Sequence, residues 1–120
     1  MTNLSGARIG GAMLQCARNC GDCLRVCTET ASHCIALGGR HADPRHLELL
    51  FDCADVCNLS VKLLARDSDF HMDLCSLCAQ VCRQCARSCE RIGEDERMRE
   101  CAEVCWRCAD SCDRMARMAA

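Results

Sequence analysis

The chain has 120 residues and a formal charge of −2, with 15 Lys or Arg residues spread along it and only three aromatic residues. This is the length of one domain, residues 1–120, that can bury its own core. Without a basic block or a set of aromatic side chains for stacking bases, a nucleic-acid-binding protein is not indicated. Charged residues interrupt every apolar run, which excludes a membrane-spanning segment.

The N-terminal segment Met1–Gln15 has no continuous apolar region of the kind that signal peptides carry. We therefore expect a cytoplasmic protein. In that reducing compartment, structural disulfides are uncommon.

Two helices are predicted in the first half of the chain. The first covers residues 11–37, because the pair Gly38–Gly39 is a left-handed C-cap signal. The second covers residues 44–66, with Asp43 as the N-cap and Pro44 at the first helical position, where its missing N–H costs nothing.

Two further helices are predicted in the second half. Ser68 is the expected N-cap of a helix over residues 69–92, which ends at Gly93. The last helix covers residues 94–118 and begins with three acidic residues, which suit the positive end of the helix dipole. Long helices with short connections favour an all-α fold, an antiparallel four-helix bundle.

Sixteen cysteines follow these helices at alternating spacings of three and four, which places them on one face of each helix. At about 100° per residue, the first five fall within an arc of roughly 60°. The stripe that normally holds leucine and valine therefore holds thiols, and all sixteen are candidate metal ligands. They are Cys16, Cys20, Cys23, Cys27, Cys34, Cys53, Cys57, Cys75, Cys78, Cys82, Cys85, Cys89, Cys101, Cys105, Cys108 and Cys112.

The pattern of the thiols fits poorly with disulfides, zinc, iron–sulfur clusters or an ordinary apolar core. Disulfides need Cα atoms within about 7 Å, whereas packed helix axes lie about 8–10 Å apart. Zinc takes four ligands in a tetrahedron, yet the second helix offers only two cysteines and the third offers five. Iron–sulfur runs commonly end in Cys-Pro, and the only proline, Pro44, is far from any cysteine. Cysteine as a small apolar core residue accounts for one or two of the thiols, not sixteen.

Cu(I) fits the pattern better than these alternatives. Thiolates select this soft ion, and two or three sulfurs suffice for each ion, so two cysteines four residues apart on one helix can form a site. Their Cβ atoms lie about 5–6 Å apart, a span that one bridging ion covers. Monovalent ions also cancel the charge of buried thiolates, and their binding releases protons. Many equivalent thiols suit the storage of many Cu(I) ions.

No arrangement of residues indicates an enzyme. The four histidines form no His-x-x-x-His pair, and no paired carboxylates project into the cysteine stripe. A thiol oxidoreductase needs one accessible Cys-x-x-Cys of low pKa, whereas the Cys-x-x-Cys pairs here merge into continuous stripes. A thiol-redox protein and a zinc-binding protein remain the alternative functions.

Several motifs carry a resemblance to a known family. Cys-Ala-x-x-Cys occurs six times, Asp52–Lys62 reads DCADVCNLSVK, and Cys75–Cys82 reads CSLCAQVC. On these motifs, roughly residues 14–120 resemble the copper storage protein family, in particular its cytosolic type. The resemblance implies a bundle that holds many Cu(I) ions in its interior, a homotetramer, and a cytosolic store that supplies copper or protects against it.

Two residues continue the cysteine stripes at one end of the bundle and are possible further ligands. His46 lies seven residues before Cys53, and Met98 lies three before Cys101. We expect this end to be polar and open, and copper to enter there. The other end is expected to be apolar and closed, and it gathers Met13, Leu64, Phe70, His71 and Met115.

One stretch departs from the family pattern. The cytosolic type often carries a histidine cluster just before the first cysteine of the fourth helix, whereas residues 93–98 contain no histidine. We therefore expect different chemistry where copper enters. His33 points off the thiol face and His41 lies in a loop, so neither is expected to be a direct ligand.

Overall fold

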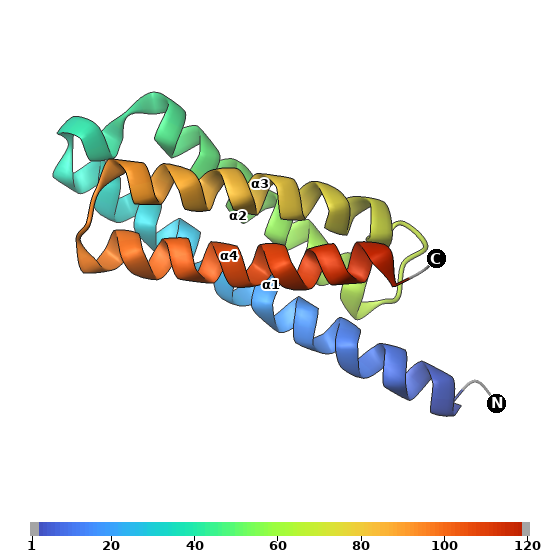
Figure 1. The fold of residues 1–120 in the computed structure, drawn as a ribbon. Helices are drawn as coiled ribbons and strands as arrows, with labels where there is room; N and C mark the ends of the chain where they lie inside the picture. Colours follow the sequence, from blue (N-terminus) through green and yellow to red (C-terminus); the bar gives the residue numbers. More distant parts are fainter. Residues whose placement is uncertain (1–2, 119–120) are drawn as a thin grey trace.

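The computed structural model describes residues 3–118, and the side chains of residues 10–118. In this part of the chain, four α-helices run antiparallel to one another without any β-strand (Figure 1). In chain order the elements are α1 (Asn3–Leu37), the 3-10 helix η1 (Gly39–Ala42), α2 (Pro44–Ala65), α3 (His71–Ile92) and α4 (Glu96–Arg117). The predicted all-α four-helix bundle is confirmed.

The helices form a closed ring of neighbours. α1 packs on α2, α2 on α3, α3 on α4, and α4 back on α1. The molecule is elongated, measuring 56 × 19 × 18 Å, and the first turns of α1 project beyond the other helices (Figure 1). No described helix combines the length and the apolar character that crossing a membrane requires.

The predicted signals around the first connection hold. Gly38 and Gly39 have positive φ angles of 70° and 56°, which glycine adopts without strain. Asp43 caps α2, because its Oδ2 accepts a hydrogen bond from the His46 N–H at 3.2 Å. Pro44 occupies the first position of that helix, as expected.

Three helix starts differ from the prediction. α1 begins at Asn3 instead of near residue 11. Ser68 does not cap α3, because its Oγ accepts the Phe70 N–H at 3.1 Å within a turn that delays the helix to residue 71. α4 begins at residue 96 instead of 94, and the side chain of its N-cap residue, Asp95, makes no capping hydrogen bond.

The bundle interior is lined with cysteine. All sixteen thiols are at most 1% exposed, and alanines beside them on the third and fourth helices, such as Ala86 and Ala109, are equally buried. Small alanine side chains let the backbones approach closely, so the thiols of different helices can meet. Large apolar side chains are few, and Leu50 is the largest among those that are fully buried.

Replacing Leu50 should therefore weaken the bundle markedly. We expect Leu50→Ala to lower the free energy of unfolding by about 2–5 kcal/mol, because it leaves a cavity in a core with few large side chains. Leu59 is 46% exposed, so Leu59→Ala should change it by less than about 0.5 kcal/mol. Anaerobic chemical denaturation of reduced protein, followed by Trp106 fluorescence, measures both. Equal effects of the two substitutions would contradict this account of the core.

Candidate metal centre

The thiols of different helices contact one another along the bundle axis. Cys53 Sγ lies 3.6 Å from Cys23 Sγ of α1 and 3.6 Å from Cys82 Sγ of α3. Towards the C-terminus of α2, Cys57 Sγ lies 3.7 Å from Cys78 Sγ. A disulfide bond is about 2.05 Å long, and all sixteen cysteines are free thiols. The disulfide alternative therefore does not describe this structure.

Groups of four sulfur atoms lie within 4.8 Å of one another, and each group draws on three helices. Five such groups are Cys20/Cys78/Cys108/Cys112, Cys57/Cys78/Cys82/Cys108, Cys23/Cys53/Cys57/Cys82, Cys23/Cys27/Cys53/Cys105 and Cys27/Cys85/Cys101/Cys105. Neighbouring groups share members, so the sulfurs form one continuous column. Sites can thus form across helices as well as from two cysteines on one helix, such as Cys23 and Cys27, whose sulfurs are 3.8 Å apart.

Because one cysteine can belong to two neighbouring groups, the column favours some metal ions over others. Four sulfurs at these distances could surround one zinc ion, but a cysteine that completes one tetrahedron is then committed to it. Cu(I) needs only two or three sulfurs, and one thiolate can bridge two Cu(I) ions. The same set of shared cysteines can therefore bind more Cu(I) ions than zinc ions. The column therefore suits many Cu(I) ions better than a few zinc ions.

Burial disfavours the charged thiolate form of the cysteines in the column. Burial raises the pKa of the Cys34 thiol to about 11. Hydrogen bonding with Cys101, together with burial, raises the pKa of Cys85 to about 11. Because the sulfurs touch, the thiols titrate as a coupled set, and a metal ion must displace protons to bind.

His46 and Met98 lie at the end of the column where α1 finishes. His46 Nε2 is 3.5 Å from Cys34 Sγ, and its Nδ1 is 2.7 Å from Ser88 Oγ. Burial lowers the pKa of His46, which favours the neutral imidazole that can ligate a metal. However, His46 is 1% and Met98 0% exposed, so the prediction that these two residues line an open end is wrong.

Two histidines lie outside the thiol column near this end. His33 points off the thiol face as predicted, whereas His41 lies in η1 and not in a loop, and both contact the carboxylate of Asp95. Sequence reasoning missed this cluster, because Asp95 is 62 residues from His33 and 54 from His41. No local motif connects residues so far apart in the chain.

The opposite end of the bundle is apolar as predicted, but one of the residues expected to close it, Phe70, does not do so. Met13, Leu64 and Met115 are buried there, at most 5% exposed. Phe70 does not close this end as predicted, since it is 69% exposed in the turn before α3. His71 Nδ1 lies 2.7 Å from the carbonyl oxygen of Ser68, so its ring belongs to the same turn.

Two buried hydroxyls on the column also escaped sequence reasoning. Thr30 lies three residues after Cys27, and Ser60 lies three after Cys57, so both occupy the register of the cysteine stripe. Both residues are 0% exposed, and neither hydroxyl has a hydrogen-bond partner among the described residues. Their spacing of three residues from a cysteine of the stripe is the sequence signal that would have identified them.

Comparison with known proteins agrees with this geometry. A family model described as "copper storage protein" matches residues 11–117. The uncharacterized cysteine-rich protein YhjQ of Bacillus subtilis (strain 168) is 34% identical over 80 residues, which make up 67% of this chain and 74% of that protein.

Solved structures with copper are also similar. The Cu(I)-bound copper storage protein BsCsp3 is 31% identical with a TM-score of 0.82, covering 88% of this chain and 98% of that one. A cytosolic copper storage protein from Streptomyces lividans, holding five coppers, is 29% identical with a TM-score of 0.80, covering 92% and 97%. The match of the family model over nearly the whole chain shows that this protein belongs to the copper storage protein family.

Proposed function

We propose that this protein binds and stores many Cu(I) ions, with all sixteen cysteines as ligands along the bundle axis. The observation that carries the proposal is the continuous column of free, buried sulfurs in contact across helices. The copper-bound relatives support it, since they share the fold at about 30% identity. The protein acts as a store and not as an enzyme.

The chemistry of loading follows from the buried thiols. Each incoming Cu(I) replaces one thiol proton when the column fills at one ion per cysteine, so the interior stays close to neutral. Shared cysteines bridge neighbouring ions, which lets one column hold many ions in a small volume. His46 and Met98 supply a nitrogen and a thioether sulfur where the column ends, and we propose them as further ligands.

Three wider statements belong to the same proposal. Residues 1–120 act as one domain. The store works in the cytoplasm, as does the Streptomyces lividans relative described as cytosolic. A homotetramer of bundles remains a prediction from the family resemblance.

The first experiment is an anaerobic Cu(I) titration of fully reduced protein with a competing chelator. We expect tight uptake of roughly one ion per cysteine, because bridging thiolates each serve more than one ion. Cys57→Ser should lower the capacity, since this thiol contacts Cys78, Cys82 and Cys108. Ser60→Ala, on the next turn of α2, should leave it unchanged. Saturation of the parent protein at one or two ions would overturn the storage function.

Copper uptake should depend on the end of the bundle that holds His46 and Met98. We expect the combined substitution His46→Ala and Met98→Ala to slow loading by about tenfold, equivalent to about 1.4 kcal/mol of barrier. Met13→Ala is the matched control, because Met13 is buried at the opposite end. Stopped-flow transfer from a coloured Cu(I) chelator measures the rates. Equal rates in the double variant and the parent would show that copper enters elsewhere.

Thiol reactivity separates a store from a redox protein. In the metal-free, reduced protein we expect no thiol to react quickly with a small alkylating agent, because all sixteen are at most 1% exposed. All sixteen should react once denaturant is added, and mass spectrometry counts them. One cysteine that reacts far faster than the others in the folded protein would instead support the redox alternative.

A further inference from the structure

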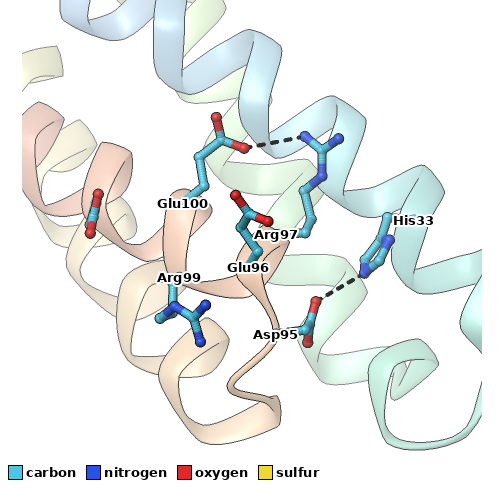
Figure 2. A pocket seen from close by; sticks show the side chains of 7 residues that line it. His33, Asp95, Glu96, Arg97, Arg99 and Glu100 are labelled. Atoms are coloured by element: carbon cyan, nitrogen blue, oxygen red, sulfur yellow. Dashed lines mark hydrogen bonds and ion pairs between the residues drawn. The ribbon is translucent and has the colours of Figure 1, made fainter.

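Three residues outside the thiol column converge at the end of the bundle where α4 begins. His33 Nε2 lies 3.2 Å from Asp95 Oδ2, and His41 Nε2 lies 3.0 Å from Asp95 Oδ1. Figure 2 shows His33 and Asp95 facing each other beside the first turn of α4. We call these three residues the His33–His41–Asp95 cluster.

Each member comes from a different segment, so the cluster is a product of the fold. His33 belongs to the last turns of α1, His41 to η1, and Asp95 to the connection between α3 and α4. The two rings meet edge-on, with centroids 5.9 Å apart, and both direct Nε2 at one carboxylate. Asp95 is the N-cap residue of α4, yet its side chain bonds the imidazoles and not the helix.

Gly93 makes room for this arrangement. A Cβ atom at residue 93 would lie 2.8 Å from Asp95 Oδ1 and 3.2 Å from His41 Nε2. The φ angle of Gly93 is −166°, an extended conformation open to any residue, so the glycine is needed for space and not for its backbone freedom. The close approach of His41 and Asp95 therefore depends on the missing side chain.

The cluster is reachable from solvent, unlike the thiols. The side chains of His33, His41 and Asp95 are 32%, 22% and 38% exposed. An open pocket of about 840 Å³ borders His33 and Asp95. Among the charged residues beside the pocket, Arg97 forms ion pairs with Glu29 and Glu100. Water from the pocket can thus complete the coordination of an ion held by the three side chains.

The donor atoms indicate which ions would bind. Two imidazole nitrogens and one carboxylate oxygen suit divalent transition-metal ions such as Zn²⁺, Ni²⁺ or Cu²⁺, whereas Cu(I) prefers thiolates. We propose that His33, His41 and Asp95 form a binding site for a divalent transition-metal ion, separate from the thiol column. The proposal uses none of the sixteen cysteines and does not depend on the proposed copper store.

The test follows the histidine rings directly, with Zn²⁺ as the probe. Protein labelled with ¹⁵N at histidine is loaded with Cu(I) to occupy the thiols and is then titrated with Zn²⁺. We expect the Nε2 resonances of His33 and His41 to shift together and saturate at one equivalent, while that of His71 stays in place. The same titration of metal-free protein, continued until the thiols are saturated with zinc, keeps the test independent of copper loading, and the two resonances should shift there as well.

Four variants assign the site. His33→Ala, His41→Ala and Asp95→Asn should each weaken Zn²⁺ binding by about 10–100-fold. Gly93→Ala should weaken it too, although it removes no ligand, because the new Cβ displaces His41 or Asp95. His71→Ala is the matched control and should bind as the parent does.

Circular dichroism and melting of each variant establish that the bundle has folded, and Asp95→Asn keeps the size and hydrogen-bonding capacity of the side chain. Unmoved His33 and His41 resonances in folded parent protein would overturn the proposal. So would parent-like binding in the two histidine variants. The cluster would then be only a set of hydrogen bonds that ties α1, η1 and α4 together.

Discussion

Contact between sulfur atoms of different helices is the interaction on which the rest of this structure depends. Distances of 3.5–3.8 Å between Sγ atoms require the helix backbones to approach closely, and the buried alanines beside the cysteines allow that approach. A thiol is a small and weakly apolar side chain, so a core built this way gains less from burial than one built of leucine. The few large side chains, such as Leu50, therefore carry a large share of the packing.

Charge sets the second constraint. A thiolate buried without a partner is strongly disfavoured, and burial raises the pKa of Cys34 accordingly. Metal binding exchanges thiol protons for cations in the same space. Ions that bind only the folded bundle also stabilise it by mass action, which compensates for the weak apolar core. Folding and loading are thus coupled through the same side chains.

Helix periodicity made the bundle and its thiol interior predictable, because cysteines spaced alternately by three and four residues all lie on one face of a helix. Contacts between segments were less predictable. Sequence placed Cys23 and Cys27 together on one helix, but it could not show that Cys53 and Cys105 complete their group. Burial of His46 was also missed, because its partner Ser88 lies 42 residues away and comes into contact only after α2 and α3 pack.

The end of the bundle where α1 finishes brings two kinds of donor atom within a few residues. Cys34 is buried and faces the sulfur column, whereas its neighbour His33 points about 100° around the helix and reaches Asp95 at the surface. A single helical step therefore separates soft sulfur donors from nitrogen and oxygen donors. His46 stands between the two environments, since its ring is buried and touches Cys34. Under the two proposals made above, soft Cu(I) ions and harder divalent ions would be held by different donor atoms at this end of the bundle.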